Sequence, residues 1–149
     1  MKFRWPLFIA LTALWSGCSW ISEVLLINMS GDVVVVRYTN AEHNVHPVAY
    51  SVERWNADSV PFLGDTVKIV WRKESDSTFY VELPKDKALI IAQGMNLDMT
   101  TGTQAKELLG IVHNLEVLKP NDEVIACSGE GCYPRTKSFS RARAGIIIR

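Results

Sequence analysis

The stretch EVLLINMSGDVVVVRYT, residues 23–39, decides the fold class of this chain. Two apolar, β-branched runs, 23–29 and 33–39, flank the turn-forming residues Ser30, Gly31 and Asp32. Consecutive valines lose side-chain freedom in a helix, so both runs are predicted to be strands. The short turn between them predicts a hairpin. Because neither run alternates with polar residues, we also predict that both faces of this hairpin are covered.

The same strand pattern recurs along the chain with turn residues at short intervals. The predicted strands are 48–55, 66–73, 78–83, 88–92, 95–99, 111–118, 123–127 and 145–148, and residues 56–65 are predicted to be a loop. Polar turns at 74–77 and 120–122 predict a second and a third hairpin. A short helix is predicted over 101–109, with Thr101 and Gln104 as a capping box and Gly110 at its end. We therefore predict an all-β fold, a single antiparallel β-sandwich-like domain of about seven to nine short strands.

The N-terminus has the organisation of a secretory signal. Lys2 and Arg4 precede an apolar run, residues 6–15, which is closed by small residues and Cys18. A helix of about ten residues, at ~1.5 Å per residue, is too short for a hydrocarbon core of about 30 Å. We predict that residues 1–17 are a signal peptide.

The end of this signal, Trp15-Ser16-Gly17-Cys18, resembles the cleavage box of bacterial lipoproteins, with tryptophan where that family usually has leucine. The resemblance implies cleavage before Cys18, a diacylglycerol on its sulfur and acylation of its new amino group. Residues 18–22 would then be a lipidated tether, and residues 23–149 a β-rich periplasmic domain.

The residue after the cysteine bears on the membrane that would hold the anchor. Aspartate at that position tends to retain lipoproteins in the inner membrane, and this chain has Ser19 there. The resemblance therefore implies the outer membrane, with the domain facing the periplasm. The alternative is an ordinary signal cleaved between Gly17 and Ser22, which would leave a soluble periplasmic or secreted protein.

Size and charge are those of one folded domain. Removing residues 1–17 from the 149-residue chain leaves 132 residues, enough for a single core. Lys plus Arg and Asp plus Glu are 16 each, and losing Lys2 and Arg4 gives the mature chain a net charge of −2. No nucleic-acid partner is expected, since such a partner would require a strong basic excess.

Two cysteines remain if Cys18 carries lipid. Cys127 and Cys132 flank a four-residue segment with two glycines, which makes a tight reversal feasible between two strand ends. The periplasm oxidises thiols, so we predict a disulfide between them. A redox-active pair or half of a zinc site are the alternatives; the first usually has a two-residue spacer and the second needs two more ligands nearby.

Chemistry-bearing residues are sparse elsewhere. His43 and His46 lie in a polar segment next to Glu42, and His113 lies far along the chain. A solvated or hydrogen-bonded loop pair is the preferred interpretation over a metal site shared by His43 and His46 with Glu42 as a third ligand. No phosphate-binding glycine loop, activated nucleophile or close carboxylate pair is evident. No residue is predicted to be catalytic, cofactor-binding or metal-ligating, and no cofactor is expected.

The C-terminal segment is basic. The chain has no acidic residue after Glu130, and its cations there are Arg135, Lys137, Arg141, Arg143 and Arg149. These side chains could meet anionic lipid headgroups or an acidic partner. The preferred interpretation is that they keep an edge strand soluble and unpaired.

These observations predict a membrane-anchored envelope lipoprotein that acts as a protein-binding or accessory module. It would bind the bilayer through its N-terminal lipid and bind an envelope protein as its partner. Its role would be that of a scaffold in an envelope or secretion assembly, or of an inhibitor or immunity protein. The alternative is a periplasmic hydrolase or ligand carrier acting on cell-wall or lipid material, with His43, His46 and His113 gathered in one pocket.

Overall fold

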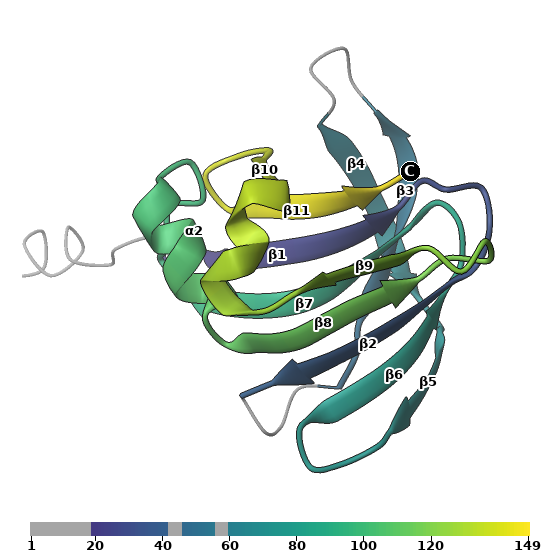
Figure 1. The fold of residues 1–149 in the computed structure, drawn as a ribbon. Helices are drawn as coiled ribbons and strands as arrows, with labels where there is room; N and C mark the ends of the chain where they lie inside the picture. The colour runs from purple at the N-terminus through teal and green to yellow at the C-terminus, as the bar shows by residue number, and fades with distance from the viewer. Residues whose placement is uncertain (1–18, 42–45, 56–59) are drawn as a thin grey trace, which may run out of the picture.

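Two β-sheets face each other in the computed structural model, which describes residues 19–41, 46–55 and 60–149 (Figure 1). The strands of the six-stranded sheet are, in order, β10 (Thr136–Ser138), β11 (Arg143–Ile148), β1 (Ile21–Asn28), β7 (Lys87–Met95), β3 (Ala49–Trp55) and β4 (Pro61–Val67). Those of the five-stranded sheet are β5 (Val70–Lys73), β6 (Thr78–Leu83), β2 (Val34–Asn40), β8 (Val112–Leu118) and β9 (Val124–Cys127). The predicted all-β sandwich-like domain is confirmed.

The described residues hold eleven strands, which exceeds the predicted seven to nine. The predicted strand 66–73 is divided, because its first residues finish β4 in one sheet and Val70 starts β5 in the other. Part of the predicted loop 56–65 is also strand, since β4 begins at Pro61. The pairing is antiparallel except between β1 and β11, which run parallel.

The predicted hairpin over residues 23–39 is wrong, although both of its strands exist. β1 and β2 lie in different sheets, so the turn between them is an arch that crosses the sandwich. Buried Asn28 organises this arch: its Nδ2 donates to the carbonyl of Asp32 at 2.7 Å and to that of Leu83 at 2.9 Å. Its Oδ1 accepts from the amide of Ser30 at 3.0 Å. These bonds bind the arch to both sheets.

The six-stranded sheet is buried on both faces at its centre. Val24 and Leu26 of β1 point into the core between the sheets, whereas Leu25 and Ile27 belong to a second apolar cluster on the opposite face. All four side chains are fully buried, as predicted for this run. The same prediction fails for β2, whose residues alternate between buried and partly or fully exposed. The second cluster also contains Ala88 and Ile90, and its cover is formed by Met29, Tyr50, Val52, Leu63 and Phe139.

The predicted helix is present as α2 (Gly102–Leu109), and its residues Ala105, Leu108 and Leu109 pack into the core between the sheets. Thr101 precedes it in an extended conformation, but the predicted capping box does not form. Gln104 Oε1 instead accepts a hydrogen bond from the amide of Asp98. α2 lies beside the 3-10 helix η1 (Gly129–Arg135), at the end of the sandwich where β1 begins (Figure 1).

The other predicted elements are confirmed in part. The second hairpin exists as β5 with β6, the third as β8 with β9, and the closing strand as β11. The predicted strand 95–99 is wrong, because β7 continues to Met95 and the chain then turns at Asn96, whose φ is 59°. β1 begins at Ile21, two residues earlier than the predicted start of the domain.

Candidate functional site

The chain is fixed in place within two residues of Cys18. Cys18 itself lies outside the described residues, and Ser19 is exposed. The backbone amide of Trp20 donates to Asn96 Oδ1 at 3.1 Å, and the amide of Asn96 donates back to the carbonyl of Trp20 at 3.0 Å. The indole Nε1 of Trp20 donates to the carbonyl of Leu97 at 3.1 Å. Three hydrogen bonds therefore secure Trp20, two residues after the predicted site of lipid attachment.

Ser22 on β1, two residues after Trp20, is bonded to the same segment. Its buried hydroxyl donates to the carbonyl of Leu97 at 2.6 Å and accepts from the amide of the same residue at 3.0 Å. Residues 21 and 22, which were predicted to be tether, are therefore part of the sheet.

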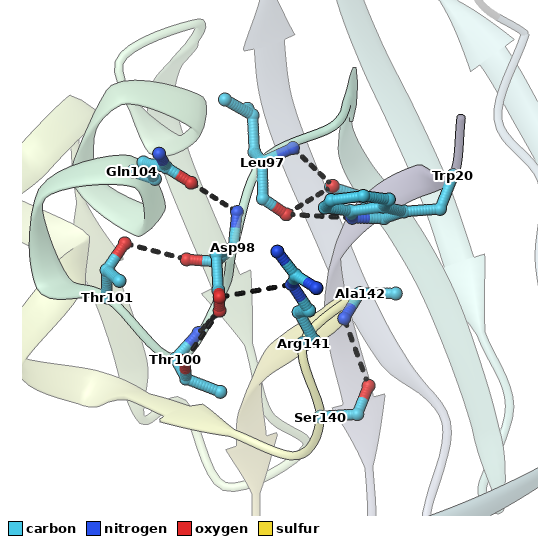
Figure 2. Close-up of polar contacts among 10 residues, drawn as sticks. Trp20, Leu97, Asp98, Thr100, Thr101, Gln104, Ser140, Arg141 and Ala142 are labelled. Carbon is cyan, nitrogen blue, oxygen red and sulfur yellow. Dashed lines mark hydrogen bonds and ion pairs between the residues drawn. The ribbon is translucent and has the colours of Figure 1, made fainter. Parts of the chain in front are cut away.

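Arg141 joins Trp20 to the segment before α2. Its guanidinium lies over the indole ring, 4.5 Å from the ring centroid, and its Nε is 3.2 Å from Asp98 Oδ2 (Figure 2). The carbonyl of Arg141 also accepts from the amide of Met99 at 2.9 Å. Three segments that are distant in sequence thus meet beside the start of β1. We call Trp20, Ile21, Met95, Asp98 and Arg141 the attachment end.

Asp98 is the polar centre of the attachment end. Its Oδ1 accepts from the amide of Thr100 at 3.0 Å and from the hydroxyl of Thr100 at 2.5 Å. These bonds, chiefly the one from the hydroxyl, and the nearby Arg141 hold the pKa of Asp98 below its ordinary value. Thr101 Oγ1 donates to the carbonyl of Asp98 at 2.8 Å. The sequence signal for this turn is an aspartate two residues before a threonine, a common local side-chain-to-backbone arrangement.

The buried carboxylate of Glu23 lies on β1, two residues after Ile21. Glu23 accepts from Arg143 Nε at 2.9 Å and from Gln93 Nε2 at 3.1 Å, across the two neighbouring strands. Burial raises the pKa of Tyr50, and the nearby Glu23 carboxylate adds to that rise. The charge of Glu23 is compensated inside the fold, which makes this cluster a structural ion pair.

The predicted pairing of Cys127 with Cys132 is present, with the two Cα atoms 5.1 Å apart. Only Cys127 is at a strand end: the chain after it forms η1, and Cys132 is buried within that helix. The disulfide therefore fastens η1 to the end of the β8–β9 hairpin.

The disulfide loop packs against α2. Lys106 Nζ lies 5.2 Å from the ring centroid of Tyr133. A Cβ on Gly102 would approach the Tyr133 hydroxyl to 2.7 Å, so this glycine makes room for the ring. The residues that the loop exposes are Ser128, Glu130, Gly131, Pro134 and Arg135, which form no apolar surface. A binding surface at this loop would therefore be polar.

The alternative function would gather His43, His46 and His113 in one pocket, and the two of these histidines that the structure describes contact different parts of the fold. His43 lies outside the described residues. The ring of His46 stacks 5.4 Å from that of Trp71, and His113 is exposed on β8. Within 19–41, 46–55 and 60–149, no group of three or more His, Cys, Asp or Glu side chains is arranged to hold a metal ion.

The outer face of the five-stranded sheet carries an exposed apolar row that was not predicted. Val70, Glu82, Val35, Leu118 and Val124 are successive cross-strand partners on β5, β6, β2, β8 and β9. Val70 is 65% exposed, Leu118 43% and Val124 56%. We call the four apolar members of this line, Val35, Val70, Leu118 and Val124, the apolar row. The apolar row is created by pairing between strands that are distant in sequence, so no local sequence pattern predicts it.

The basic segment does not solubilise an edge strand in the way predicted. β11 lies inside the sheet between β10 and β1, and β10 is the edge. Arg141 and Arg143 pair with Asp98 and Glu23, so two of the five cations are neutralised within the domain.

Comparisons with protein-family models, curated proteins and solved structures gave no match to this chain. No helix in the part of the chain that the structure describes is long and apolar enough to cross a bilayer.

Proposed function

We propose that this chain is a bacterial outer-membrane lipoprotein, anchored through Cys18, and that it acts in the periplasm as a protein-binding or accessory module. Its role would be that of a scaffold in an envelope or secretion assembly, or of an inhibitor or immunity protein. The lipid would hold the domain in place, and the domain would act through its surface.

The observation that carries the binding function is the apolar row. Large aliphatic side chains are normally scattered singly over a surface, and contiguous exposed patches mark interaction sites. Here partly exposed Val35 and exposed Leu118 and Val124 are adjacent across three strands, on a face that no described element covers. Glu82 separates Val35 from exposed Val70 at the other end of the row. Val35 lies just after the arch that ends β1, so the row is at the opposite end of the sandwich from Trp20 (Figure 1). A partner held there would not compete with the membrane for the same surface.

The charged groups support binding over catalysis. Glu23, the one buried carboxylate among the described residues, is matched by Arg143 and Gln93. A hydrolytic acid or base needs a side chain that can exchange protons with a substrate. An ion pair with its hydrogen bonds satisfied supplies stability instead.

Membrane anchoring is tested by replacing Cys18 with Ala in the full chain. We expect the variant to leave the membrane fraction and the parent protein to remain there. Equal membrane retention of the two would contradict the lipid anchor. Absence of the parent protein from the membrane fraction would favour the soluble periplasmic or secreted alternative.

Partner binding is tested by capture from detergent-solubilised envelopes with the full lipidated chain. We expect a specific envelope protein to be retained by the parent and lost when Leu118 and Val124 are both replaced with Glu. Phe62→Glu is the matched control, because Phe62 is similarly exposed, at 42%, but lies on β4 of the other sheet. Equal capture by all three proteins would contradict the role of the apolar row.

A further inference from the structure

The distance between the predicted lipid and the folded domain is very short. One residue, Ser19, separates Cys18 from Trp20. Consecutive Cα atoms are about 3.8 Å apart, so the Cα of Cys18 can be no more than about 8 Å from that of Trp20. Since Trp20 is hydrogen-bonded to Asn96 and Leu97, this reach is measured from a fixed point on the domain.

The surface at that fixed point is apolar. Ile21 and Met95 are cross-strand partners on β1 and β7, with exposed fractions of 60% and 67%. Both point to the outer face of the six-stranded sheet, because Glu23 and Gln93, two residues further in, form the next pair on that face. β11 pairs with β1 only from Glu23 onward, so no strand lies beside Ile21 on the side opposite Met95.

The side chains around this pair have the character of a membrane interface. Trp20 is a half-buried aromatic residue, and tryptophan is enriched at the level of lipid headgroups. Its indole NH is bonded to the carbonyl of Leu97. Arg141 covers that ring, and its side chain is 68% exposed while it contacts Asp98. Aliphatic side chains thus lie next to an aromatic ring and an exposed guanidinium that is paired with Asp98.

We infer that the attachment end lies against the bilayer that holds the lipid of Cys18, with Trp20, Ile21 and Met95 in its headgroup region. This inference deepens the proposed function and rests on its lipid anchor. β1 then leads away from the membrane for eight residues, a rise of about 26 Å at ~3.3 Å per residue. The apolar row on the five-stranded sheet is consequently presented to the periplasm, away from the lipid surface.

The test uses the full lipidated chain bound to vesicles of phosphatidylethanolamine and phosphatidylglycerol with some spin-labelled headgroups. An environment-sensitive fluorophore is placed on Met95→Cys, on Ile21→Cys or on Val33→Cys, one site at a time. Val33 is the matched control, because it is apolar and 52% exposed but lies beyond the far end of β1. Two exposed proximal sites ensure that one poorly folded variant does not decide the outcome.

We expect headgroup quenching at residues 21 and 95 to exceed that at residue 33 by at least about threefold, as for side chains buried in the headgroup layer. Equal quenching at the three sites, or stronger quenching at residue 33, would overturn the inference. Flotation of the same samples with the vesicles separates the two proposals. Protein that floats but is quenched equally rejects the orientation alone, whereas protein that does not float rejects the lipid anchor and the orientation with it.

Discussion

Replacing Leu25 with Ala tests whether the outer face of the six-stranded sheet is a true core. Leu25 is fully buried in the second apolar cluster. The substitution removes three carbon groups, each worth about 0.8 kcal/mol of burial, or about 2.4 kcal/mol together. Because neighbours enclose the site, the unfilled cavity raises the expected loss in the free energy of unfolding to about 3–4 kcal/mol.

Leu26→Ala and Leu118→Ala are the matched controls for this measurement. Leu26 is the next residue along β1 and is equally buried, but in the core between the sheets. Leu118 is 43% exposed, so its truncation should cost about 1 kcal/mol or less.

Urea unfolding followed by circular dichroism gives all three free energies. We expect Leu25→Ala to resemble Leu26→Ala. A loss below about 1 kcal/mol for Leu25→Ala, beside a full loss for Leu26→Ala, would refute the second core.

Three other measurements follow from the described contacts. Replacing Cys127 and Cys132 with Ala should lower the free energy of unfolding by about 2 kcal/mol, since the sequence separation of the two cysteines is only 5. A loss above about 4 kcal/mol, measured by urea unfolding, would contradict this expectation. Arg143→Met should lower the free energy of unfolding by about 2–3 kcal/mol, because it leaves the Glu23 carboxylate without its cation. This loss is smaller than for a fully buried ion pair, since the Arg143 side chain is 43% exposed. The double variant Glu23→Gln with Arg143→Met should recover part of the lost free energy. Burial raises the pKa of Tyr38, so its protonated phenol favours the fold below its ordinary pKa of about 10, and this contribution is lost as the pH rises further. Tyr38→Phe should flatten the alkaline fall in unfolding free energy, and an unchanged slope would contradict the assignment.

Local sequence patterns were sufficient where one segment determines its own conformation. The β-branched run 33–36 had to be extended, since helix restricts such side chains. The hairpins β5–β6 and β8–β9 followed from polar turns between neighbouring strands. The helix predicted over 101–109 followed from Gly110 at its end, although the capping box expected at its start does not form. The disulfide followed from two thiols only five positions apart.

Pairing between distant segments could not be predicted in the same way. The turn at Ser30 to Asp32 suits a hairpin or an arch equally well, and the hydrogen bond from Asn28 to the carbonyl of Leu83 selects the arch. The interior position of β11 depends on β1 accepting it as a parallel neighbour. The attachment end likewise needs Trp20, Asp98 and Arg141 to come together from three segments.

The sequence alone determined that this chain is β-rich, because strand preference is set by neighbouring residues. The secretory signal with its lipoprotein-like cysteine is a prediction from the same kind of local pattern. Only the tertiary structure decided which strands pair, which faces are buried and which side chains surround the start of β1. The physical reason is that hydrogen bonds between strands are formed by the backbone, which every residue shares, so the choice of partner depends on how all the side chains pack together.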